Sequence, residues 1–293
     1  MDLNLSPLPE TLRAHRTRAP LLPPETHTLL RQLGNAHIDI GDIAHTLERF
    51  PSITARLIAL ANSAWSSPAS RIVSLRAACT RLGLNMVRSV SLGLAVGMPF
   101  DASRCPSFMA ERFWFDALLG AETAGWIKEA VGPWSPLDPQ AARSAGLLRN
   151  LGLLWLTESM PAEVDRALTA AAQDPDLGLD EALRAHCGID HHHAGAHLGQ
   201  RWGLPEVLVV GMAHHGDPDY DGEYWQCAHL LGLTGQLVGT LNDDAAWAEA
   251  AARYPHLPLM GEAGASDELL ALRQRAAARG ADIRAIVKVL FPH

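Results

Sequence analysis

The chain reads Asp190-His191-His192-His193-Ala194-Gly195, and a second pair, His214-His215, begins 19 residues after Gly195. An aspartate such as Asp190 caps the start of a helix by accepting a backbone hydrogen bond. Gly203 can end that helix, and Pro205 suits the first turn of the next one. The stretch therefore predicts two successive helices that carry histidines. Neutral histidine is the commonest nitrogen ligand for divalent metals, so a metal site is also sought here.

Apolar residues recur at helical spacing on both sides of this stretch. Short stripes follow one another from Thr26 to Val96, and a long one runs from about Phe108 to Val131. No segment alternates apolar and polar residues with the period of a strand over a useful length. The sequence predicts an all-α fold.

We expect three parts along the chain. Residues 1–22 are polar and rich in proline, which indicates a flexible lead-in. Residues 23–241 form one helical domain, with an N-terminal lobe over about 23–97 and a second lobe over about 108–241. Residues 242–293 form a C-terminal helical extension, with helices over 266–279 and 281–291. Its apolar faces are too large to leave in water, at about 25 cal/mol per Å², so we expect it to pack on the body.

Composition narrows the class of protein. The 293 residues are 48% hydrophobic and 19% charged, with a net charge of −8, which argues against a broad nucleic-acid interface. No apolar run is long enough for a membrane span or a signal peptide. The four cysteines are widely spaced, which favours reduced thiols over a disulfide framework. We expect a cytoplasmic protein without membrane or nucleic-acid partners.

Several fragments, taken in order and spacing, resemble the HDOD branch of the HD superfamily of helical metal-dependent phosphohydrolases. The resemblance covers roughly residues 22–241 and implies an HD-like helical domain with a regulatory role in bacterial signalling. It rests on Leu57 to Ala64, Leu75 to Ala78 with Leu82-Gly83, Phe113-Trp114, Leu147-Leu148 with Leu151-Gly152, His191 to Gly195, Trp202 with Leu204-Pro205, and His214-His215.

The resemblance also implies a ligand set. Active HD enzymes hold one or two metals with an upstream histidine, a His-Asp dipeptide, further histidines and a late aspartate. The upstream histidine matches Asp116, and the dipeptide matches Arg149-Asn150. His191 and the pair His214-His215 match the later histidines. No acid occurs in residues 230–236, where the late aspartate should fall, and no Gly-Tyr-Pro element follows His215.

Arg149 is the decisive departure, because a guanidinium stays protonated and cannot ligate a metal. Asp116, Arg149, Asn150, His191, His214 and His215 therefore form a degenerate metal or anion pocket, or they are polar core residues bonded to one another and to backbone carbonyls. We favour the second interpretation. Successive helical residues diverge by about 100°, so His192 and His193 are expected to be peripheral.

One more residue has two interpretations. Trp65 and the connector that follows it could serve a partner, or Trp65 could pack into the seam between the two lobes. The sequence does not separate these alternatives.

The sequence thus favours a non-catalytic signal-transduction module that acts through contacts with other signalling proteins. It needs no catalytic residue, metal or cofactor, and a small anionic ligand is a further candidate partner. Two alternatives stay open. One is a metal-dependent phosphohydrolase or cyclic-dinucleotide phosphodiesterase of the HD type. The other is a sensor that binds an anion or nucleotide in the former active-site pocket.

Overall fold

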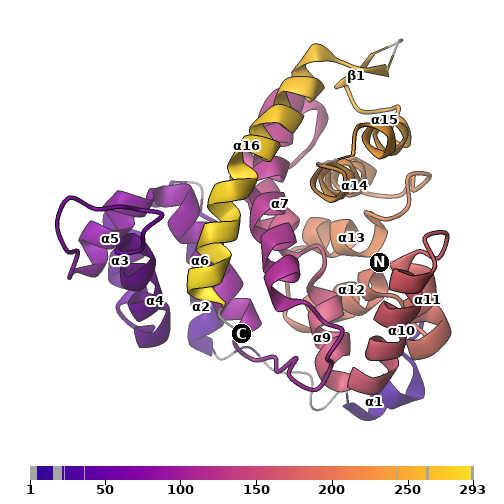
Figure 1. Ribbon diagram of the computed structural model, residues 1–293, viewed down its shortest axis with the longest axis horizontal. Helices are drawn as coiled ribbons and strands as arrows, with labels where there is room; N and C mark the ends of the chain where they lie inside the picture. Colours follow the sequence, from indigo (N-terminus) through magenta and orange to yellow (C-terminus); the bar gives the residue numbers. More distant parts are fainter. Residues whose placement is uncertain are drawn as a thin grey trace.

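A computed structural model describes residues 5–15, 22, 24–35, 37–241, 243–261 and 264–291. This part of the chain is almost wholly helical, which confirms the all-α prediction (Figure 1). Its only strands are β1 (Met260–Gly261) and β2 (Gly264–Ala265), a two-residue antiparallel pair. The helices are α1 (Glu10–His15), α2 (Pro24–Leu33), α3 (Ile40–Leu47), α4 (Pro51–Ala61), α5 (Leu75–Leu82), α6 (Leu84–Gly97), α7 (Ala110–Val131), η1 (Gly132–Trp134), α8 (Pro139–Leu148), α9 (Leu151–Ser159), α10 (Pro161–Gln173), α11 (Leu179–Cys187), α12 (His191–Arg201), α13 (Glu206–His214), α14 (Trp225–Gly239), α15 (Asp244–Ala252) and α16 (Asp267–Leu290).

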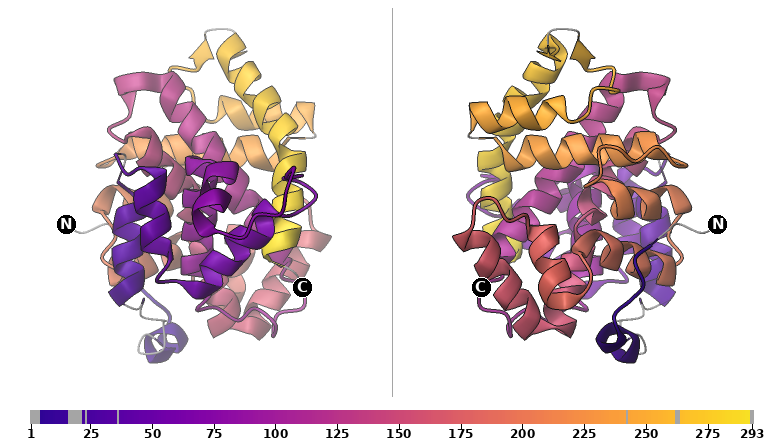
Figure 2. Two further views of the ribbon diagram at one scale, coloured as in Figure 1. Left: turned by 90° about the vertical axis from the view of Figure 1, so that its left-hand side faces the viewer. Right: turned by 90° about the vertical axis from the view of Figure 1, so that its right-hand side faces the viewer.

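Two groups of helices lie on either side of the long helix α7. Helices α2 to α6 gather on one side, and α9 to α15 gather on the other (Figure 1). Helix α7 packs against α8, α14 and α16, and α6 contacts both α7 and α8. In the side views the indigo to purple helices lie in front from one side and the pink to orange helices from the other, with α16 along the edge of the body in both (Figure 2). Helix α7 therefore lies between the two groups and contacts α6 of one and α14 of the other.

Short-range capping sets several helix starts. Asp39, Ser74 and Asp190 each accept a hydrogen bond from the backbone N–H three residues on. Such caps satisfy backbone donors that the first helical turn leaves unpaired. Gly188 and Gly203 have positive φ and follow the ends of α11 and α12. The boundaries at Asp190 and Gly203 are those expected from the sequence.

The N-terminal segment differs from its expectation. Residues 5–15 are not a flexible lead-in, because they carry helix α1 and Leu12 is fully buried. His197 Nε2 lies 2.8 Å from the carbonyl oxygen of Ser6, which ties the segment to α12. Leu8, just before α1, and Leu12 within it are both buried in the main apolar core, a signal that the polar and proline-rich surroundings obscure in the sequence. Residues 16–21 lie outside the described part of the chain.

The C-terminal extension also differs in detail, because α16 is one continuous helix instead of two. It passes through Gly280, which lies inside the helix and close to the ring of Phe115. A glycine costs a helix only about 1 kcal/mol relative to alanine, and apolar residues are buried on both sides of it. After the helix, Phe291 stacks on Trp114 with ring centroids 4.2 Å apart.

Two glycines let α9 and α12 approach at the level of their backbones. A Cβ placed on Gly152 would lie 2.8 Å from Gly195 Cα and would overlap the carbonyl oxygen of His191. Backbone atoms cannot move aside as a flexible side chain can. This contact holds the start of α12 against α9 and so positions the histidines.

Gly152→Ala is therefore expected to lower the free energy of unfolding by about 1–3 kcal/mol, as overpacking does. Gly239→Ala is the control, because a Cβ there meets no atom within 4 Å. It should leave stability unchanged or raise it slightly, since alanine favours helix. Urea unfolding followed by circular dichroism measures both, and equal midpoints would contradict the backbone contact.

Candidate functional site

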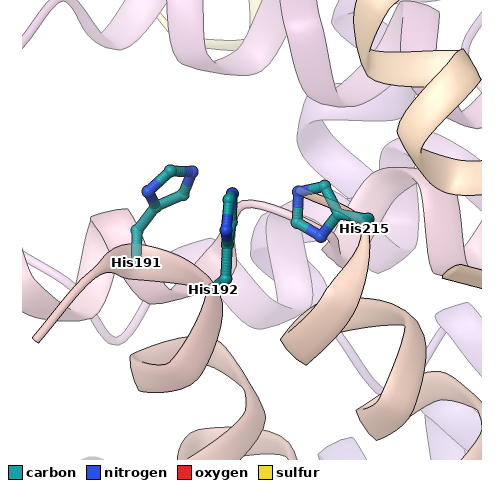
Figure 3. A group of neighbouring side chains, drawn as sticks. All are labelled: His191, His192 and His215. Carbon is teal, nitrogen blue, oxygen red and sulfur yellow. The ribbon is translucent and has the colours of Figure 1, made fainter. Parts of the chain in front are cut away.

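Three histidine rings come together between the start of α12 and the end of α13 (Figure 3). His192 lies between the other two, with ring centroids 4.0 Å from His191 and 4.3 Å from His215. One ring nitrogen from each residue falls within 4.8 Å of the others. We call His191, His192 and His215 the histidine cluster.

The membership of this cluster corrects two sequence-based assignments. His192 is not peripheral, and His214 is not part of the cluster: its ring stacks on Tyr220, with centroids 3.9 Å apart. The reason is that His191 and His192 both belong to the first turn of α12. Side chains lean toward the N-terminus of a helix, so the rings of residues 191 and 192 both project at the N-terminal end of α12. There they meet His215, while His193 stays 6.2 Å from His214.

The orientation of His215 is set by the backbone of its own helix. Its Nδ1 lies 3.1 Å from the carbonyl oxygens of Gly211 and Met212. Carbonyls only accept, so Nδ1 carries the proton and Nε2 keeps its lone pair. The hydroxyl of buried Tyr254 donates to the carbonyl oxygen of His215 at 3.0 Å. The ring is therefore fixed through Nδ1, and Tyr254 holds the backbone of the same residue.

The histidine cluster is electrically neutral at physiological pH. Burial, and then the neighbouring His215 and Arg149, lower the pKa of His191 to about 3. Burial also lowers the pKa of His192 and of His215 well below the usual value. His191 is only 7% exposed, and within the described residues its Nδ1 has no hydrogen-bond partner. The cluster is thus a group of uncharged imidazoles, one of them with an unsatisfied nitrogen.

Asp190 anchors the same turn from outside the cluster. It is buried, and it accepts hydrogen bonds from the backbone N–H and Nδ1 of His193 and from Arg184. Burial alone would raise the pKa of the Asp190 carboxyl, but the bonds from His193 hold it below its usual range. Gly216 leaves room for the His192 ring, which a Cβ at that position would overlap.

Arg149 lies at the junction of three helices and is 3% exposed. Its Nη1 donates to the carbonyl oxygens of Asp116 on α7, at 3.0 Å, and of Gly146 on α8, at 2.7 Å. A Cβ on Gly120 would overlap this guanidinium, and one on Gly235 of α14 would touch it. Its positive charge lowers the pKa of both His191 and His215.

The other two candidates take part only indirectly. Burial raises the pKa of Asp116, while the charges of Arg149 and Arg112 lower it, so the carboxyl interacts with Arg149 and not with the histidines themselves. Asn150 occupies the N-cap of α9 without a side-chain capping bond. The structure thus brings together Arg149, His191 and His215, adds His192, and leaves His214 outside.

The cluster can offer three nitrogen ligands, but it does not fit an HD-type hydrolytic metal centre. Such a centre needs carboxylates to offset the charge of its ions. The described cluster holds none, and Arg149 adds a positive charge beside it. No step of metal-dependent hydrolysis follows from this arrangement.

The profile of the HDOD domain matches residues 19–218. The chain belongs to the HDOD domain family. A protein of Treponema pallidum (strain Nichols) without assigned function is 26% identical over 232 residues, which cover 77% of this chain and 43% of that protein. The HDOD chain thus spans less than half the length of this relative. In the described part of this chain, no helix is long and apolar enough to cross a membrane.

Solved structures share the fold at low sequence identity. A candidate signal transduction protein from Marinobacter aquaeolei VT8 superposes with a TM-score of 0.75 at 24% identity, over 98% of this chain and 60% of that one. A candidate phosphohydrolase from Shewanella amazonensis SB2B gives 0.71 at 22%, over 96% and 98%. An HDOD domain protein from Geobacter sulfurreducens, of unknown function, gives 0.67 at 21%, over 99% and 95%. These likenesses establish the fold alone.

The neutral cluster predicts a loss of stability in mild acid. Unfolded histidines protonate near pH 6.5, but folded His191 does not until about pH 3. The unfolded state therefore binds more protons as the pH falls through this window, and stability falls by up to about 1.4 kcal/mol per pH unit for one such histidine. Above the pKa of the unfolded histidine, about 6.5, this contribution of His191 to stability no longer changes with pH.

Urea unfolding of chelator-treated protein between about pH 7 and pH 5.5 measures the effect. His191→Gln should flatten the dependence on pH. His45→Gln is the control and should follow the wild type, because the His45 side chain is 88% exposed. Parallel curves for His191→Gln and the wild type would show that His191 does not remain neutral.

Proposed function

We propose that this HDOD protein is a regulatory module of signal transduction that carries no phosphohydrolase activity at its histidine cluster. The observation that supports this most directly is Arg149, which matches the histidine of the metal-binding His-Asp dipeptide. A guanidinium cannot ligate a metal. Its charge reaches the cluster, since it lowers the pKa of His191 and His215.

Simple electrostatics supports the same conclusion. Two unit charges about 4 Å apart interact by about 4 kcal/mol at an effective dielectric of 20. In an HD-type centre a carboxylate would attract the metal, whereas here Arg149 would repel it. Because Arg149 Nη1 already donates to two backbone carbonyls, the guanidinium also helps to join α7 and α8. Because Arg149 is bonded to the backbone in this way, the structure disfavours the alternative in which the pocket is a sensor that binds an anion through Arg149.

The positive part of the proposal is signalling through protein contacts, and a surface loop supports it. Asn62 accepts from the N–H of Ile72 at 2.9 Å and donates to its carbonyl at 2.7 Å. Arg81 binds the other end of the loop at Ser66. The loop that these bonds hold in place leaves Val73 80% exposed. A preorganised loop loses little conformational entropy on binding, so an apolar tip of this kind suits a protein partner.

Trp65 itself takes no part in this surface. Its ring is partly buried against the core, and Arg279 of α16 lies over it at 6.0 Å. The structure therefore favours the interpretation in which Trp65 packs into the seam between the lobes.

The first test is an assay with a generic phosphodiester, a cyclic dinucleotide and nucleotides, each with manganese, iron or nickel. We expect no turnover above the uncatalysed rate. Asn150→Asp alone should not create activity, because Arg149 remains and residues 230–236 still contain no acid. Metal-dependent turnover in the wild type that His215→Ala removes and His214→Ala keeps would overturn the proposal.

A variant that should gain metal binding tests the same proposal from the opposite direction. Replacing Arg149→His together with Asn150→Asp removes the repelling charge and adds two ligands. This variant should bind a divalent ion at least about tenfold more tightly than the wild type, a difference of 1.4 kcal/mol. Calorimetry and metal analysis measure binding, and thermal unfolding checks that the variant is folded.

The contact surface has its own test. Val73→Asp should weaken co-purification with the native partner by about tenfold or more, as the loss of a buried apolar contact and burial of a charge would. Met109→Asp is the matched control, because Met109 is 65% exposed outside this loop. Equal recovery of the partner by both variants would rule out this loop as the contact surface.

A further inference from the structure

A cavity of about 510 Å³ lies at the seam between the two lobes. The N-terminal lobe contributes the turn between α5 and α6, and the other side is formed by α7, α8 and α16. No member of the histidine cluster lines it. The lining residues are Leu82, Gly83, Leu84, Asn85, Met86, Glu122, Trp126, Arg143, Arg275 and Arg279.

Three arginines line the cavity on the side formed by α8 and α16. Two of them are paired with carboxylates: Arg279 bonds to Glu122 through two bonds of 3.0 Å and to Asp282 at 2.7 Å, and Arg143 bonds to Glu129. Arg275 is exposed, and its guanidinium lies 4.1 Å from the ring of Trp126, which holds it at the rim. Within the described residues Arg275 has no carboxylate partner, so its charge stays available to an anion.

Arg143 adds a buried group with unused hydrogen-bonding capacity. It is 7% exposed, and its Nη2 bonds to Glu129 at 2.9 Å. Its Nη1 is buried and has no partner within the described residues. A guanidinium nitrogen left without an acceptor costs free energy. Nη1 lies against Gly125 of α7, where a Cβ would overlap it, so an anion would meet it only if the guanidinium turned toward the cavity.

The opposite wall is the start of helix α6. The N-cap is Gly83, which has no side chain to accept hydrogen bonds, and the first helical bond runs from Val87 N–H to Gly83 O. The N–H groups of residues 84–86 therefore have no partner within their own helix, and these residues line the cavity. The N-terminus of a helix also carries partial positive charge, which suits phosphate.

We propose that this cavity binds a phosphate-bearing small molecule about the size of a nucleotide, with its phosphate between the N-terminus of α6 and the arginines. A volume of about 510 Å³ lies within the range of roughly 300–1,000 Å³ that small-molecule pockets occupy, and it exceeds what a single phosphate fills. The ligand contacts both lobes at once, so its binding opposes their separation. This site is independent of the histidine cluster and of its lack of activity.

Isothermal titration calorimetry tests the proposal on the full chain, with inorganic pyrophosphate, GDP and guanosine as probes. Both phosphate-bearing probes should bind and guanosine should not. Tighter binding of GDP than of pyrophosphate supports a ligand of nucleotide size, and equal or weaker binding of GDP would overturn that part of the proposal. Affinity should fall as the salt concentration rises.

Two variants localise the site. Arg275→Gln should weaken binding about tenfold or more, as the loss of a charge-assisted bond does. Asn85→Asp places a carboxylate in the first turn of α6, where it stabilises a helix but repels an anion. It should therefore weaken binding without lowering the melting temperature, which a folding defect could not explain.

Arg284→Gln is the matched control, because Arg284 is an exposed arginine of α16 that lies over the Phe115 ring, outside the cavity. It should bind like the wild type. Absence of saturable heat with pyrophosphate and GDP at millimolar concentrations would overturn the proposal. So would an unchanged affinity in both Arg275→Gln and Asn85→Asp, or an equal loss in Arg284→Gln.

Discussion

The buried guanidinium of Arg149 is the interaction on which the centre of this structure depends. Taking a charge out of water is costly unless it is hydrogen-bonded, and Arg149 meets that requirement with carbonyl oxygens from α7 and α8. Glycines 120 and 235 leave the space that it occupies. Helices α7, α8 and α14 are thus arranged around one side chain. The same side chain puts a positive charge beside the histidines.

The histidine cluster follows from two further constraints. Burial and mutual proximity keep the rings neutral, and the backbone contact of Gly152 with Gly195 fixes the turn that carries two of them. An enzyme would use neutral imidazoles to hold a metal. In this HDOD protein they lie beside the positive charge of Arg149, which lowers the pKa of His191 and His215.

The two lobes are joined by α7 and by the C-terminal helix, and the seam between them holds the arginine-lined cavity. Helix α16 supplies two of its arginines and also packs on α4 and α7. The C-terminal extension is therefore packed into the body. In the proposed regulatory role, a ligand that bridges both lobes would be a physical means of supplying an input.

The sequence by itself determined the helical class, the helix cap at Asp190 and the inability of Arg149 to ligate a metal. All of these depend on local spacing or on the chemistry of a single side chain. Only the tertiary structure decided that His192 joins the cluster in place of His214, that Leu12 is buried and that α16 continues through Gly280. Those outcomes depend on where a helix ends relative to its neighbours, and on apolar faces whose partners lie far away in the chain. Periodicity within a segment carries neither kind of information.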